Sequence, residues 1–267
     1  MTTLVVTDLD GTVWDNTLRC HPATLKAVHQ LVADDEIELL VATGRRRNSA
    51  RRAFTANGFL LPSVLLNGAI GYDFANETIF HQATFTADQL AAVLGVLQRF
   101  QLGPVAYLSD TRACVVEGVT TSVGHIESLG EDLVWSSFEE LATRTDVLGM
   151  SMLGVEQNLV APALQELVNL PGVETAAFGD HLYPPFSLML APDTVTKAVG
   201  IRAYLDYAQL APSRIIALGD AGNDLAMLAM ADIALVVIGG DQRAIDLSHH
   251  LIEGPENGGW ATVLDHL

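Results

Sequence analysis

The sequence predicts an α/β protein with a Rossmann-like parallel-sheet core and an inserted α+β domain. Near both ends of the chain, short apolar runs that stop at polar or glycine-containing loops alternate with helical apolar patterns. The runs are apolar at nearly every position, which is typical of parallel strands covered on both faces. Roughly 105 residues with a different pattern separate the two parts, which indicates an insertion.

The first part of the chain begins with a β-loop-α-β-loop unit. Each run of apolar β-branched residues stops at a polar loop, DLDGT after the first and TGR after the second. The expected elements are strands at 4–7, 37–42 and 64–66, a helix at 22–32 and a hairpin at 71–81 that turns near Asn76.

The same pattern returns late in the chain, with strands expected at 214–218 and 233–237 and a helix at 225–230 between them. Within the insert, the expected elements are helices at 87–100 and 161–170 and strands at 113–116 and 148–153. We therefore expect residues 1–82 and 188–267 to form the core, and residues 83–187 to form a separate domain.

The composition limits the possible partners. The 267-residue chain carries a formal charge of −18, the opposite of what a protein that binds nucleic acid or anionic membranes requires. The two cysteines, Cys20 and Cys114, form neither a disulfide framework nor a metal motif. With no apolar run long enough to cross a bilayer and no secretory leader, we expect a cytoplasmic protein, monomeric or homodimeric.

Two acidic residues, Asp8 and Asp10, follow the first expected strand. In an extended segment their carboxylates project to one face, and two like charges so close need a cation or a shared proton. The following Gly11 and Thr12 offer main-chain N–H groups and a hydroxyl that can face an anion. A plain surface turn is the alternative, because Asp and Gly favour turns.

A second acidic group, Asp220, Asn223 and Asp224, follows a late strand. Ligand sites of open α/β sheets lie at the carboxyl ends of the strands, so the two acidic groups are expected to meet there. An oxygen-rich site without His or Cys suits Mg²⁺ and disfavours zinc. Helix capping by Asn and Asp is the alternative explanation.

Two further groups fit an anion bound to such a metal. Thr43 and Gly44 end a strand and present a hydroxyl and N–H groups, while the next residue, Arg45, faces either the site or solvent. Arginines from Arg46 onward are interpreted as the solvated face of a helix. Lys197, one of two lysines in the chain, supplies an ammonium where phosphate oxygens meet carboxylates, unless it is an ordinary solvated helix residue.

In this order, DLDGT, TGR, Lys197 and GDAGND resemble the motifs of the haloacid dehalogenase-like hydrolases. The long stretch between TGR and Lys197 resembles subfamily IIB, which includes Cof-type, sucrose-phosphate and mannosyl-3-phosphoglycerate phosphatases and phosphomannomutase. The late segment GPENGGW is similar to one in the mannosyl-3-phosphoglycerate phosphatases, although for Trp260 packing of the final helix against the core is the preferred explanation.

The resemblance implies a Mg²⁺-dependent phosphatase that acts on a small phosphorylated sugar or sugar-acid conjugate. It implies that Asp8 attacks phosphorus and that Asp10 protonates the leaving oxygen and then activates water. Mg²⁺ would bind Asp8, the main-chain oxygen of Asp10 and Asp220, supported by Asn223 and Asp224. The residues implied to bind phosphate are Thr43, Gly44 and Lys197.

Selectivity for the substrate is expected to reside in the insert, where Arg112 and His181 are candidate contacts, together with Arg45 and Asn67 of the core. Tyr107, His125 and Tyr183 are further polar candidates in the insert, for which an ordinary role in the fold or on the surface is the preferred explanation. Two alternative functions remain open on the motifs alone. One is a sugar phosphomutase, and the other is a non-catalytic phosphate-binding module.

Overall fold

The computed structural model describes residues 2–116, 118, 120–180 and 182–267. The chain divides into two compact units, and each is described by itself. The first unit comprises Met1–His81 and Thr196–Leu267, and the second comprises Gln82–Val195. The boundary that the sequence suggested at residues 187 and 188 falls inside a strand of the second unit, Phe186–Pro192.

The first unit is built on a sheet with the strand order β14-β13-β12-β1-β2-β3-β4-β5. Six of these strands, from β14 to β3, run parallel, and β4 turns back antiparallel to β3. The strands are β1 (Thr3–Thr7), β2 (Ile37–Ala42), β3 (Ser63–Leu65), β4 (Ile70–Asp73), β5 (Thr78–Gln82), β12 (Arg214–Gly219), β13 (Ile233–Val237) and β14 (His250–Ile252). This arrangement confirms the expected parallel-sheet core.

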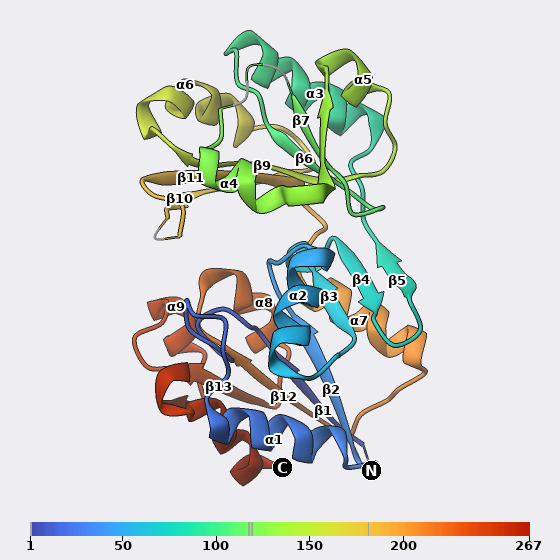
Figure 1. Ribbon diagram of the computed structural model, residues 1–267, viewed down its shortest axis with the longest axis vertical. Coiled ribbons are helices and arrows are strands. Elements are labelled where there is room, and N and C mark those ends of the chain that lie inside the picture. The colour runs from blue at the N-terminus through green and yellow to red at the C-terminus, as the bar shows by residue number, and fades with distance from the viewer. Residues whose placement is uncertain (1, 117, 119, 181) are drawn as a thin grey trace. The chain divides into compact units, whose positions relative to one another are not determined.

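Helices cover both faces of this sheet, with α1 and α2 on one face and α7 and α8 on the other (Figure 1). The helices are α1 (Pro22–Val32), α2 (Arg47–Asn57), α7 (Lys197–Ala208), α8 (Leu225–Leu228) and α9 (Gln242–Asp246). Short 3-10 turns are η1 (Leu66–Gly68), η3 (Gly222–Asp224), η4 (Pro255–Asn257) and η5 (Gly259–His266). Because both faces are covered, β1 is apolar and buried along nearly its whole length.

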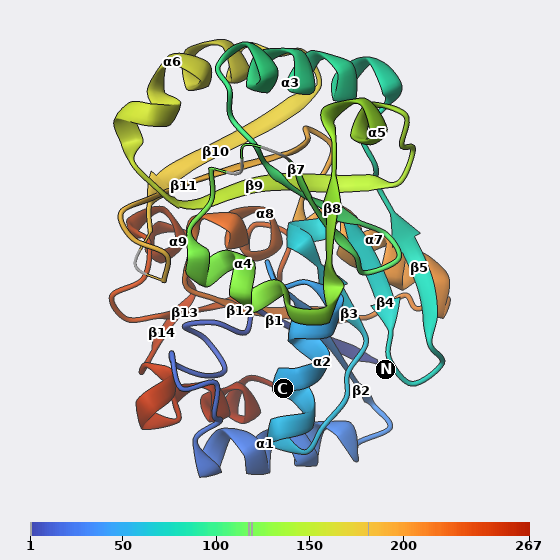
Figure 2. The ribbon, with the colours of Figure 1, turned by 45° about the horizontal axis from the view of Figure 1, so that its top comes forward.

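The second unit is a mixed sheet in the order β10-β11-β9-β6-β7-β8. Its strands are β6 (Val105–Leu108), β7 (Ala113–Val116), β8 (Leu133–Ser136), β9 (Val147–Val155), β10 (Val173–Gly179) and β11 (Phe186–Pro192). Its helical elements are α3 (Ala87–Arg99), α4 (Val123–Leu129), η2 (Gly130–Asp132), α5 (Phe138–Ala142) and α6 (Gln157–Leu167). The helices α3, α5 and α6 share one hydrophobic core with the sheet, and α4 lies on the opposite face (Figure 2).

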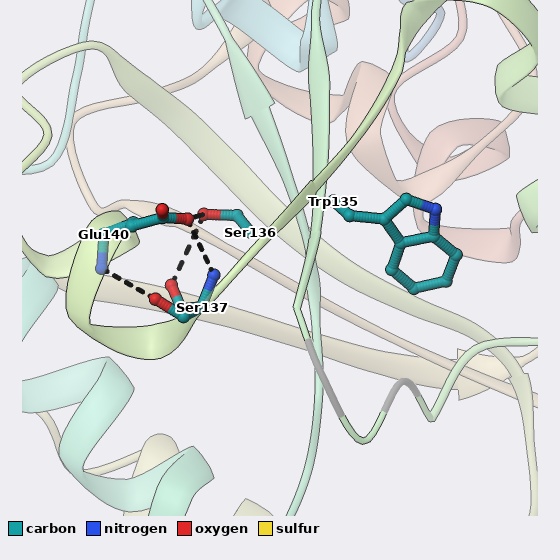
Figure 3. Close-up of a pocket in the computed structure, with 4 residues that line it drawn as sticks. All are labelled: Trp135, Ser136, Ser137 and Glu140. Atoms are coloured by element: carbon teal, nitrogen blue, oxygen red, sulfur yellow. Dashed lines mark hydrogen bonds between the residues drawn. The ribbon is translucent and has the colours of Figure 1, made fainter.

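The second unit has a pocket at its edge strand β8. It is lined by Trp135, Ser136, Ser137 and Glu140, and Glu140 and Ser137 bond each other there in a capping box (Figure 3). None of the sequence-predicted site residues lines this pocket.

In the part of the chain that the structure describes, no helix is long and apolar enough to cross a bilayer.

Candidate active site

The site of the first unit is centred on Asp8, which directly follows β1. Its main-chain N–H donates to the carbonyl oxygen of Leu218 in β12 at 2.9 Å, so the residue is held between the central strands. The carboxylate is buried, and its Oδ1 accepts a hydrogen bond from Lys197 Nζ at 2.5 Å. Lys197 is fully buried at the first turn of α7, where Thr196 caps the helix. The solvated-lysine alternative for Lys197 is therefore wrong.

Lys197 also donates to Asp224 Oδ1 at 2.6 Å, so a single ammonium bridges two carboxylates. The other oxygen of Asp224 accepts the main-chain N–H groups of Asp220 at 3.0 Å and Ala221 at 2.9 Å. Asp224 thus caps the turn after β12 and fixes the direction in which Asp220 points. Capping and site formation, which the sequence offered as alternatives, are combined in this one side chain.

Asp220 completes a group of three carboxylates. Each of Asp8, Asp220 and Asp224 offers an oxygen within 4.8 Å of the others, and Thr12 donates to Asp220 Oδ1 at 2.8 Å. Gly11 allows this approach, because its φ is +83° and a Cβ there would lie 2.5 Å from Asp220 Oδ2. Clustered carboxylate oxygens without nitrogen or sulfur donors fit a hard cation such as Mg²⁺.

Burial and mutual repulsion shape the charges of this group. Burial raises the pKa of Asp8 above its usual range, with Asp224 and Asp220 adding to the effect and Lys197 opposing it. Burial also raises the pKa of Asp220 to about 6. Burial acts against the Lys197 ammonium, but the two carboxylates outweigh it and raise the pKa of the lysine. A cation bound here would favour the ionised carboxylates.

Asp10 lies apart from this group of three, and its side chain is 48% exposed. Arg45 donates to both of its oxygens, from Nε at 2.7 Å and Nη2 at 2.6 Å, and Trp14 Nε1 donates at 3.0 Å. Ser49 accepts from Arg45 Nη1 at 3.0 Å and steadies the guanidinium. The charges of Asp8 and Asp10 are therefore balanced by separate cationic side chains. The contribution of Trp14 has no signal in the sequence.

The β2–α2 loop presents the groups expected to face phosphate. Thr43 is buried, and its hydroxyl accepts the main-chain N–H of Arg45 at 3.2 Å. Asn67, which follows β3, accepts a hydrogen bond from Asn223 Nδ2 at 2.9 Å. The structure thus brings the residues of all four sequence motifs to one edge of the sheet.

Trp260 supports the site from the late part of the chain. Its side chain is fully buried, and Nε1 donates to Thr7 Oγ1 at 2.9 Å. The Thr7 hydroxyl in turn donates to the main-chain oxygen of Asp8 at 2.7 Å. The packing role expected for Trp260 is confirmed, and it includes a hydrogen-bonded connection to Asp8 that sequence reasoning did not identify.

The candidates of the second unit are less distinctive. Arg112 pairs with Asp110 two residues earlier, so its charge is already balanced. His181 lies outside the described residues. Tyr107 and His125 are buried and joined at 3.0 Å, and Tyr107 also bonds Ser151 at 2.6 Å. These contacts connect the sheet to α4.

Comparison with known proteins places this geometry in context. A family model described as haloacid dehalogenase-like hydrolase matches residues 5–264. A Mycoplasma genitalium protein, provisionally named a phosphatase, is 21% identical over 258 residues, which cover 90% of this chain and 88% of that protein. An uncharacterised hydrolase of Schizosaccharomyces pombe is 22% identical over 260 residues, with 89% and 81% covered.

Solved structures share the fold. A sugar phosphatase of HAD subclass IIB superposes with a TM-score of 0.76 at 19% identity, covering 99% of this chain and 98% of that one. A Thermotoga maritima protein superposes with a TM-score of 0.78 at 16% identity, covering 100% and 98%. Both likenesses extend over both units of the chain.

Proposed function

The chain belongs to the haloacid dehalogenase-like hydrolases, and we propose that it is a Mg²⁺-dependent phosphatase acting on a small phosphorylated sugar or sugar-acid conjugate. The carboxylate group around Lys197 carries the proposal. When Asp8, Asp220 and Asp224 are ionised, three negative charges surround one buried ammonium, which leaves an excess that a divalent cation offsets. The family resemblance and the phosphatase names of relatives support the same reaction class.

We assign the nucleophile to Asp8. Lys197 binds Oδ1, and among the described residues Oδ2 has no hydrogen-bond donor, so that oxygen is available to attack phosphorus. The new Oδ2–P bond forms as the bond from phosphorus to the sugar oxygen breaks, which yields an aspartyl-phosphate. Lys197 keeps the attacking carboxylate in a single orientation, because its ammonium is anchored on the other side by Asp224.

We assign proton transfer to Asp10. As an acid it would donate a proton to the departing sugar oxygen, and as a carboxylate it would then take one from the water that cleaves the aspartyl-phosphate. Its half-exposed side chain can exchange protons with solvent between the two steps. Arg45 and Trp14 set the direction of its oxygens.

The Thr43 hydroxyl, the Gly44 main chain and Lys197 are the proposed phosphate-binding groups. Asp8, Asp220 and the main-chain oxygen of Asp10 would hold Mg²⁺, with Asn223 and Asp224 supporting them, and the ion would supply charge neutralisation to the phosphoryl group. We propose that the second unit selects the sugar, as the family resemblance implies.

The test is release of inorganic phosphate from a panel containing hexose phosphates, sucrose phosphate and mannosyl- and glucosyl-phosphoglycerate, with Mg²⁺ and with chelator. Selective release that chelator abolishes is the expected result. Release that is indifferent to chelator contradicts the metal requirement. Isomerisation of a sugar phosphate without net release would instead identify a mutase.

A further inference from the structure

The three-residue turn η1, directly after β3, has an unusual backbone. Leu66 and Asn67 have φ values of 49° and 57°, and Gly68 has a φ of 117°. Side-chain-bearing residues rarely adopt this left-handed region, and such strain persists only where the surroundings hold it in place. The strand expected at 64–66 ends one residue early, at Leu65, because the backbone of Leu66 enters the left-handed region.

The main chain of this turn holds the loop that presents the phosphate-binding groups. The N–H of Leu66 donates to the carbonyl oxygen of Arg45 at 3.1 Å, and the N–H of Asn67 donates to that of Thr43 at 3.0 Å. These two hydrogen bonds hold the loop in place on either side of Gly44. A Cβ on Gly44 would lie 3.2 Å from Asn67 Oδ1, so the amide lies closely over that residue.

The side chain of Asn67 reaches a second motif. Its Oδ1 accepts from Asn223 Nδ2 at 2.9 Å, in the turn that carries Asp220 and Asp224. Asn combines a tolerance of left-handed backbone with an amide short enough to bond locally, which explains this residue type here.

Gly68 connects the turn to a third motif. A Cβ on this glycine would lie 2.1 Å from the carbonyl oxygen of Thr196, the residue that caps α7 just before Lys197. One turn therefore contacts the Thr43 loop, the Asn223 turn and the start of α7.

We propose that Asn67 is a positioning residue that fixes the spacing between the Thr43–Arg45 loop and the acidic turn at Asn223. It acts through main-chain and side-chain bonds to these two loops rather than by contact with substrate, which replaces its expected role in substrate binding. The inference rests on the proposed phosphatase function, because the groups that it spaces are those assigned to phosphate and metal.

The experiment compares Asn67→Gly and Asn67→Ala with wild-type protein. Glycine keeps the left-handed backbone and removes only the amide, whereas alanine also strains the turn. Gln209→Gly is the matched control, because Gln209 has a φ of 53° in the same unit but lies at the far end of α7. Turnover of 4-nitrophenyl phosphate, tungstate binding with Mg²⁺ and thermal midpoint are measured for each protein.

We expect Asn67→Gly to lower kcat about 10- to 100-fold and to weaken tungstate binding, at an unchanged or higher thermal midpoint. Gln209→Gly should leave kcat and tungstate binding unchanged. Asn67→Gly combined with Asn223→Ala should be no worse than the poorer single variant, because both remove the same bond.

Full kcat and tungstate affinity in Asn67→Gly, or losses that multiply in the double variant, would overturn the positioning role. Inactivity of the wild-type protein towards every phosphate ester would instead contradict the proposed function. In that case tungstate binding still decides the inference, because it reports the spacing of the loops without turnover.

Discussion

Two clusters of polar side chains, one in each unit, differ in how their charges and hydrogen-bonding atoms are paired. In the ionic cluster of the first unit, the Lys197 ammonium hydrogen bonds to Asp8 and Asp224, and the Asp220 carboxylate lies close to both. The hydroxyl cluster of the second unit, Tyr107, Thr121, His125 and Ser151, joins its members by hydrogen bonds of 2.6 to 3.0 Å.

The difference distinguishes the candidate site from a network of hydrogen-bonded polar side chains. In the ionic cluster carboxylates outnumber cations in a buried place, which costs stability unless a ligand balances them. In the hydroxyl cluster, hydroxyl and imidazole groups hydrogen bond to one another, and Thr121 adds a bond to the main chain of Leu153 at 3.0 Å. Unbalanced buried charge is therefore the more informative sign of chemistry in this molecule.

The largest expected effect comes from Asp8→Asn. The amide oxygen and nitrogen preserve the shape of the side chain but remove the proposed nucleophile, so kcat should fall more than about 10³-fold. Circular dichroism and the thermal midpoint should show a folded protein, because a buried charge has been removed. Retention of most of the wild-type rate in a phosphate-release assay would show that another residue attacks phosphorus.

Lys197→Met should destabilise the protein strongly. Methionine fills a similar volume but leaves the Asp8 and Asp224 carboxylates buried without their shared cation, so we expect a loss of about 3–5 kcal/mol in the free energy of unfolding. Urea unfolding measures this loss. Lys26→Met, in the exposed part of α1, is the matched control, and equal effects of the two substitutions would contradict the role of the ion pairs.

Arg45→Ala tests whether Arg45 orients the Asp10 carboxylate or binds phosphate. Loss of the two guanidinium bonds frees the Asp10 side chain, so turnover of sugar phosphates should fall about 10- to 100-fold. Turnover of 2,4-dinitrophenyl phosphate should fall less, because that leaving group departs without a proton. Equal losses on both substrates would place Arg45 in phosphate binding instead.

Tyr107→Phe probes the second cluster. It removes the hydroxyl that hydrogen bonds to His125 and Ser151, and the free energy of unfolding should fall by about 1 kcal/mol. Hydrolysis of 4-nitrophenyl phosphate should stay within about twofold of wild type. A large fall in kcat with an unchanged unfolding free energy would give the hydroxyl cluster a functional role.

The smallest effect concerns pH. Burial acts to raise the pKa of Asp73, but hydrogen bonds from Asn76, Ala75 and Tyr207 outweigh it and lower that pKa. A carboxyl group with a lowered folded-state pKa contributes stability above its unfolded pKa of 3.8, and this is lost as pH falls through the folded value. Asp73→Asn should therefore flatten the stability curve below about pH 4, measured by urea unfolding. If stability falls with decreasing pH in Asp73→Asn as it does in the wild-type protein, the lowered pKa of Asp73 is contradicted.

Much of the first unit is predictable because its signals are local. The strands at 37–42 and 233–237 have the predicted bounds, since each apolar run stops at a turn residue. The site follows from the same rule, because parallel strands bring their carboxyl ends to one edge. No local signal predicts the Arg45–Asp10 pair or the Trp260–Thr7 bond, which join distant segments through the tertiary fold.

The second unit was harder to predict. The strand at 113–116 has the predicted bounds, but β6, β8, β10 and β11 were not expected. The sheet leaves one face without α3, α5 and α6, and small or hydroxyl residues such as Ser151 and Ser187 on that face obscure the apolar pattern. The helix expected at 161–170 instead spans Gln157–Leu167, with Pro162 inside it.

The bond from Trp260 to Thr7 has a consequence for synthesis of the protein. Asp8 is made 189 residues before Lys197, and Asp224 and the tryptophan that secures β1 are made later still. A nascent chain therefore carries the Asp8 carboxylate without the partners that orient it while the intervening residues are made. The hydrogen-bonded surroundings of Asp8 are complete only after residue 260 has emerged from the ribosome.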